Sequence, residues 1–160
     1  MHNLDTLPAL GLRSERPALK APATFSHFKA QVEALLGRHD RYRRPDYADD
    51  AAEVISRLPE DPYVLAVFME DSLNYEASAE LVDILTGLWP LWLVTHETVI
   101  AEWVASQKMA LLPLRSEISC ISPGGESVRG VLVEVDASMA RYRVQSGDTV
   151  FLLNHEDVAP

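Results

Sequence analysis

Val128-Arg-Gly-Val-Leu-Val-Glu-Val-Asp136, followed by Arg141-Tyr-Arg-Val144 and Val150-Phe-Leu-Leu153, decides the fold of this chain. Apolar residues recur here at about every second position, which is the period of a β-strand with one buried face. Upstream of Pro113 they recur every three or four positions, the period of an α-helix. The change of period near Pro113 predicts helices before that residue and strands after it.

The strands expected after Pro113 are short and separated by turn residues. They span residues 117–121, 128–136, 141–145 and 149–153, with a turn at 123–126 and a single helical turn at 154–157. Tyr142 and Val144 are expected to point inward. Val131, Val133 and Val135 share one face by parity, whereas Val128 has the opposite parity. The sequence therefore predicts a bulge or a sharp bend at Gly130.

Residues 116–158 resemble the SH3-like small barrels, including the KOW and Tudor types. The resemblance rests on the strand pattern quoted above and on the terminal Glu156-Asp157-Val158. It implies a barrel that binds RNA, peptides or methylated side chains. A methyl-lysine reader needs an aromatic cage, and this segment offers only Tyr142 and Phe151, which are expected to fill the core. Contact with another protein is the implied role.

The region before Pro113 predicts an all-helical bundle. Helices are expected at residues 24–36, 47–58, 63–73, 76–88 and 95–109. Thr24 and Thr95 are expected N-caps, as are Asp46 and Asp61. Gly87 and Pro90 should end the fourth helix near Trp89. The run at 64–69 is apolar on all sides, which predicts a buried element.

The chain thus divides into three predicted regions of an α+β protein. Residues 1–23 contain three prolines and predict an extended or mobile arm. Residues 24–112 form the acidic helical bundle, and residues 113–160 form the SH3-like barrel.

Charge and composition limit the function classes. The 160-residue chain has a net charge of -10, with a balance of +4 over residues 1–44, -10 over 45–115 and -4 over 116–160. This acidity argues against nucleic-acid binding by the whole surface. The single cysteine, Cys120, excludes an intramolecular disulfide and suits the cytoplasm. No secretory signal or membrane-spanning run is expected, because the longest apolar stretch is far short of the ~20 residues that cross a bilayer.

A basic connector is the strongest local signal for binding. Arginine matches phosphate with two parallel hydrogen bonds, and tyrosine stacks on bases. The candidate partner-binding residues are Arg38, Arg41, Tyr42, Arg43 and Arg44 in the connector, with Arg129, Arg141 and Arg143 in the barrel. The alternative is a solvated loop that complements the carboxyl end of the first helix.

No motif points to catalysis. His96-Glu97 begins like a zinc-protease helix, but Ile100 stands where the second histidine must be. No metal and no cofactor are therefore expected. The sequence predicts a non-enzymatic binding or scaffolding protein that acts through protein–protein contacts. The alternatives are a nucleic-acid-associated accessory factor that uses the basic connector and the barrel arginines, and a small enzyme of unknown chemistry. The oligomeric state is left open.

Overall fold

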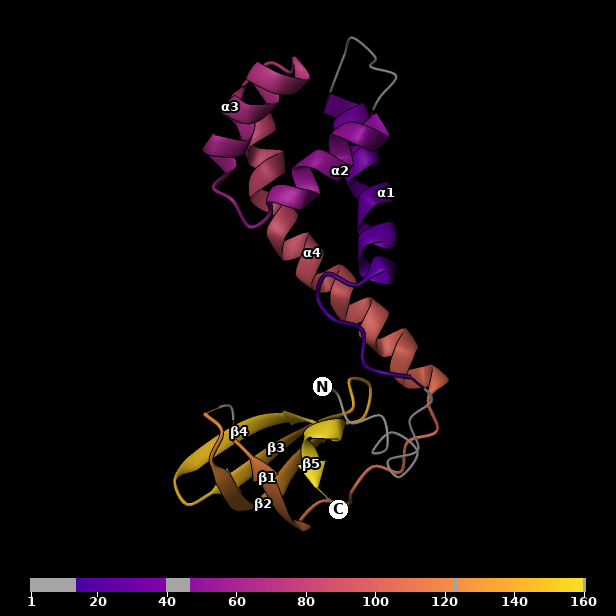
Figure 1. Ribbon diagram of the computed structural model, residues 1–160, viewed down its shortest axis with the longest axis vertical. Coiled ribbons are helices and arrows are strands. Elements are labelled where there is room, and N and C mark those ends of the chain that lie inside the picture. The colour runs from indigo at the N-terminus through magenta and orange to yellow at the C-terminus, as the bar shows by residue number, and fades with distance from the viewer. Residues whose placement is uncertain (1–13, 40–46, 123, 160) are drawn as a thin grey trace. The chain divides into compact units, whose positions relative to one another are not determined.

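The structure is a computed structural model that describes residues 14–39, 47–122 and 124–159. It is a mixed α+β fold in which the helices precede the strands, as predicted (Figure 1). The helices are α1 (Pro22–His39), α2 (Tyr47–Arg57), α3 (Pro62–Leu73) and α4 (Ala79–Ser106). The strands are β1 (Glu117–Ile121), β2 (Ser127–Asp136), β3 (Arg141–Ser146), β4 (Thr149–Asn154) and β5 (Val158–Ala159), with the 3-10 helix η2 (His155–Asp157) before β5.

The chain forms two compact units. The helical unit comprises Pro17–Val99, and the sheet unit comprises the described residues up to Arg16 together with Ile100 and the residues after it. The division falls inside α4.

The beginnings of the helices follow local capping chemistry. Asp61 caps α3 as predicted, because its Oδ1 accepts the N–H groups of Tyr63 and Val64 at 2.9 and 3.3 Å. The prediction of Thr24 as the cap of α1 is wrong. α1 begins two residues earlier at Pro22, a residue type that suits the first helical turn. Thr24 is buried inside the helix, with its Oγ1 at 3.2 Å from Nδ1 of His96.

The predicted break at Pro90 is also wrong, because α4 is one helix of 28 residues that contains it. Pro90 cannot donate to the carbonyl of Thr86, a loss that costs a helix interior about 3 kcal/mol. Burial of Leu88 and Trp92 on either side of Pro90 offsets that cost. Thr95, a predicted cap, instead lies within α4 and donates its hydroxyl to Leu91 O at 2.8 Å.

The core of the helical unit is formed by one face of each helix. Phe28 of α1 and Trp92 of α4 meet edge to face with ring centroids 4.8 Å apart. The other large buried side chains include Val32, Leu36, Val54, Leu65, Met69, Leu81, Leu85 and Leu88. The expectation that the run in α3 is buried on all sides is wrong. Tyr63, Val64 and Val67 are more than half exposed.

One helix passes a length and composition test for a membrane span among the described residues, and it is α4. The core helix of a soluble protein passes the same test, and α4 contributes Leu81, Leu85 and Leu88 to the helical core.

The strands form one antiparallel sheet in the order β4-β3-β2-β1-β5, which is curved in Figure 1. The predicted strands and the predicted helical turn after β4 are confirmed. Leu132, Tyr142 and Val144 are completely buried in the core of the sheet unit. The Tyr142 hydroxyl accepts the Leu112 N–H at 3.1 Å and lies 2.7 Å from Nδ1 of His155.

The bulge in β2 lies at Val133 and not at Gly130. Pairing with β1 is regular through Gly130, whereas the register with β3 shifts between Leu132 and Glu134. The extra residue changes the parity of the strand. Val131 and Val133 are therefore exposed while Val135 is partly buried, so the three valines do not share one face.

Gly130 has a different reason to be glycine. A Cβ at this position would lie 2.6 Å from both Gln145 O and Val144 Cγ1. The absence of a side chain lets β3 approach β2 closely.

The described end of the N-terminal arm is attached to the sheet unit through Arg16. Its guanidinium donates to Met139 O at 2.9 Å and Ala140 O at 3.1 Å, and forms an ion pair with Glu156. The same group lies 5.0 Å from the ring centroid of Trp103. Residues 1–13, for which the sequence predicts an extended or mobile arm, lie outside the described residues.

Candidate functional site

The candidate site is the outer face of the sheet, meaning the exposed side chains of β1 to β4. Cross-strand register places Glu117, Val131, Gln145 and Val150 in one row across these four strands. All four are exposed. Residues opposite one another in a sheet are close enough for their side chains to interact, so this row is a continuous surface.

A second row contains an ion pair beside an apolar side chain. Glu134, Arg143 and Leu152 are register partners on β2, β3 and β4. The Arg143 guanidinium lies 3.4 Å from the Glu134 carboxylate, and both side chains are 58% exposed. An exposed pair of this kind contributes about 0–1 kcal/mol to stability. Its main consequence here is that the charge of Arg143 is locally balanced.

Exposed aliphatic side chains gather on this face. Val131, Val133, Val150 and Leu152 are 40%, 45%, 54% and 59% exposed. They lie on β2 and β4, on either side of the polar residues of β3. Grouped exposed apolar side chains are typical of interaction surfaces.

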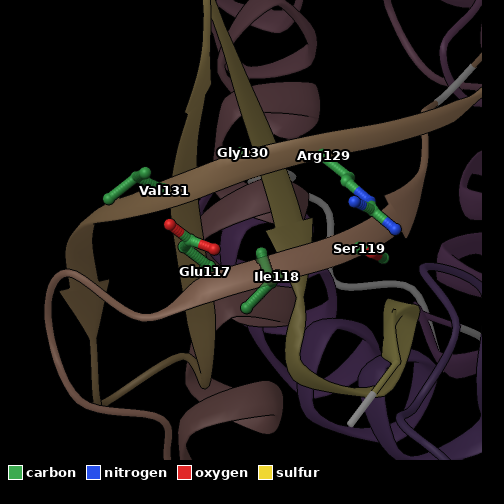
Figure 2. A pocket seen from close by; sticks show the side chains of 6 residues that line it. All are labelled: Glu117, Ile118, Ser119, Arg129, Gly130 and Val131. Carbon is green, nitrogen blue, oxygen red and sulfur yellow. The ribbon is translucent and has the colours of Figure 1, made fainter.

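A groove of about 420 Å³ lies over β1 and β2 (Figure 2). Its lining is Glu117, Ile118, Ser119, Arg129, Gly130 and Val131. Arg129 and Ser119 are register partners at one end of the groove, and Glu117 and Val131 are partners at the other (Figure 2). The groove thus combines one positive group, one negative group and one exposed apolar side chain, Val131.

Arg129 is exposed and differs from the other sheet arginines in its surroundings. Among the described residues it forms no ion pair and no side-chain hydrogen bond. An exposed guanidinium with its five donors unused within the described part of the chain is available to a partner's carboxylate or carbonyl oxygens.

Arg141 is engaged with its own strand neighbours. Its Nε donates to Asn154 Oδ1 at 3.4 Å, and Asp136 is its register partner on β2. The pKa of Asp136 lies below its ordinary value chiefly because the Ser138 hydroxyl donates to the carboxylate. Backbone N–H donors and the charge of Arg141 act in the same direction, and burial opposes them. A smaller hollow of about 210 Å³ lies at this end of the sheet.

The predicted binding arginines do not merge into one basic stripe. The row that contains Glu117 and Val131 separates Arg129 from Arg143 along the strands. Along β1 to β5, three arginines are matched by three carboxylates, Glu117, Glu134 and Asp136. The outer face is therefore locally neutral.

Of the predicted binding residues in the connector, only Arg38 lies among the described residues. Arg38 is exposed in the last turn of α1, within the helical unit. The predicted binding residues Arg41, Tyr42, Arg43 and Arg44 lie outside the described residues, as does Asp46, the predicted cap of α2.

The exposed aliphatic side chains were missed from the sequence as binding residues. Alternation predicts which residues share a face, but it does not say which face is covered. A signal was present in β4, where Val150 to Leu153 are apolar at consecutive positions, so both faces of the strand carry apolar residues.

The single thiol and the acidic side chains do not form a reactive or metal-binding centre among the described residues. Cys120 is 4% exposed, and burial raises the pKa of its thiol above the ordinary value. Across the part of the chain that the structure describes, no group of three or more His, Cys, Asp or Glu side chains is placed to hold a metal ion.

Comparison of the chain with protein-family models, with curated proteins and with solved structures gives no match.

Proposed function

We propose that this chain is a non-enzymatic binding or scaffolding protein that holds another protein in the groove over β1 and β2. The observation that carries the proposal is Arg129, which stands unpaired among the described residues in a groove that also contains the exposed Val131. Glu117 at the other end of the groove supplies a complementary group for a partner's cation. A segment with an acidic group, an apolar residue and a basic group along its length fits this arrangement.

We further propose that the sheet is an SH3-like barrel. Three features support this assignment. The strand order is β4-β3-β2-β1-β5, the 3-10 helix η2 joins β4 to β5, and β5 returns to pair with β1. Barrels of this class bind peptides and nucleic acids on the same small scaffold, so the side chains decide between these ligands.

Charge favours a protein partner over a polyanion. A nucleic-acid surface has clustered lysine and arginine, whereas the strands carry as many carboxylates as arginines and Arg143 is paired with Glu134. The basic connector that begins at Arg38 supports the alternative of a nucleic-acid-associated factor.

The test of the proposal is affinity capture from the source cells with matched charge variants. Arg129→Glu reverses the charge in the groove, and Lys20→Glu makes the same change on an exposed lysine of the helical unit. We expect a captured protein whose recovery falls at least about tenfold with Arg129→Glu and is unchanged with Lys20→Glu, because a reversed charge repels the group that Arg129 binds. Equal recovery with both variants refutes the groove as the binding site.

A direct titration tests the nucleic-acid alternative. Single-stranded RNA and duplex DNA labelled with a fluorophore are added to the full chain at low and at moderate salt. Binding that weakens steeply with salt and is lost on replacing Arg38, Arg41, Arg43 and Arg44 with glutamate favours the accessory factor. Absence of binding at low salt removes it.

A further inference from the structure

The open edge of β4 has an unusual composition for an exposed strand. β4 is one end of the sheet, so no described strand pairs with its outer edge. Its sequence, Thr-Val-Phe-Leu-Leu-Asn, contains no charge and no proline. Proteins protect edge strands with charged residues, proline, bulges or very short strands. The opposite edge, β5, is only two residues long, whereas β4 lacks each of these protections.

The turn before β4 determines which backbone groups face this edge. Gly147 and Asp148 form a two-residue loop, and the φ of 59° at Gly147 fits a type II′ turn. Such a loop closes on a hydrogen-bonded pair, which here is Ser146 with Thr149. Hydrogen-bonded and non-bonded pairs alternate along an antiparallel ladder.

It follows that Phe151 bonds to β3, whereas the N–H and C=O groups of Val150 and Leu152 point away from it. None of the other backbone hydrogen bonds of the described residues involves these four groups. The available edge ends at Asn154, because its N–H already donates to Asp157 Oδ2 at 3.3 Å.

The same two residues carry aliphatic side chains that are more than half exposed. Val150 is 54% exposed and Leu152 is 59% exposed, both on the outer face. Unpaired backbone groups and apolar side chains therefore coincide at two alternate positions of one strand.

We propose that this edge binds a second copy of the chain, with β4 of one copy antiparallel to β4 of the other about a twofold axis at Phe151. This register places Val150 of each copy opposite Leu152 of the other, and all four free groups on each strand form hydrogen bonds across the axis. An axis at Leu152 would set Val150 opposite Asn154, whose N–H is occupied. An axis at Val150 would set Leu152 opposite Asp148, which lies in the turn before β4.

The chemistry of the edge favours a second copy over another partner. The strand is complementary to itself, since aliphatic residues meet aliphatic residues and neither strand has a charge. Arg143, the register partner of Leu152, is neutralised by its ion pair with Glu134. The result is an apolar centre with a polar rim, which is the usual anatomy of a protein interface.

Sedimentation velocity of the full chain over a concentration series tests the proposal. We expect reversible formation of a dimer that Leu152→Lys weakens at least about tenfold, because symmetry removes the contact twice. The matched control is Val133→Lys, which places the same charge on an exposed outer-face valine of β2. It should leave the dimer unchanged.

Amide hydrogen exchange supplies an independent readout. Protection of the Val150 and Leu152 amides should rise with protein concentration, while the Phe151 amide should be protected at all concentrations. A chain that stays monomeric, or a dimer that Val133→Lys disrupts as much as Leu152→Lys, overturns the proposal. So does protection at Val150 and Leu152 that depends on another protein and not on concentration.

Failure here is separable from failure of the proposed function. Arg129→Glu should reduce capture of the partner at least about tenfold and leave the dimer intact. Leu152→Lys should weaken the dimer and leave capture of the partner unchanged.

Discussion

Gly130→Ala offers a quantitative test of the close approach between β2 and β3. The new Cβ would lie 2.6 Å from the Gln145 carbonyl oxygen and 2.6 Å from Cγ1 of Val144, which is completely buried. Neither a backbone carbonyl nor a buried β-branched side chain yields easily. Overpacking of this kind costs ~1–3 kcal/mol. We expect a loss of about 2 kcal/mol in the stability of the sheet unit.

The assay is thiol labelling of the native protein, because Cys120 is the only cysteine and lies in β1. The side chain is 4% exposed, so labelling requires the sheet to open. A loss of about 2 kcal/mol increases the open population, and with it the labelling rate, about 30-fold.

Gly124→Ala is the matched control in the same unit. Its added Cβ would meet only Ser122 Oγ at an ordinary 3.7 Å, so its labelling rate should stay within about twofold of the unmodified protein. Equal rates for Gly130→Ala and Gly124→Ala would refute the argument that glycine is required by the packing of β3.

Three further predictions concern other contacts. Arg16→Ala should destabilise the sheet unit by about 1–3 kcal/mol, because it removes the ion pair with Glu156 and two hydrogen bonds to carbonyls, and Cys120 labelling measures the loss. Tyr142→Phe should cost a similar ~1–3 kcal/mol by leaving its hydrogen-bond partners unpaired. Burial raises the pKa of Tyr142 above its ordinary 10.0. The stabilising contribution of the neutral Tyr142 is therefore complete below pH 10.0 and is lost as the pH rises through the pKa of the folded state. Urea titrations at increasing pH should show this loss of stability in the unmodified protein and not in Tyr142→Phe. Pro90→Ala should raise the melting temperature of the helical unit, because Pro90 is exposed and alanine restores a donor, a gain of up to about 3 kcal/mol.

Local patterns predicted most of the secondary structure. The predicted strands appear as β1 to β4, and Asp61 caps α3 as its side chain requires. The predicted break at Pro90 is wrong because the local cost of a proline is smaller than the burial gained on both sides of it in α4. The order of residues along the chain does not show whether burial outweighs the cost of the proline.

The candidate site was predicted only in part. Arg129 was predicted as a binding residue from its charge. That Arg143 is paired and Arg129 is not depends on Glu134, which strand pairing places opposite Arg143. The bulge at Val133 also depends on pairing between strands, since it is defined by a shift in register.

The sequence by itself determined the change from helical to strand period near Pro113, because hydrophobic spacing depends only on neighbours along the chain. The tertiary structure decided which apolar residues remain exposed, which arginine keeps its charge available and which strand edge stays open. Each of these depends on contacts between residues distant in sequence. Val150 and Leu152 have the same β-strand spacing as buried residues, and only their place on the outer face of the sheet leaves them exposed.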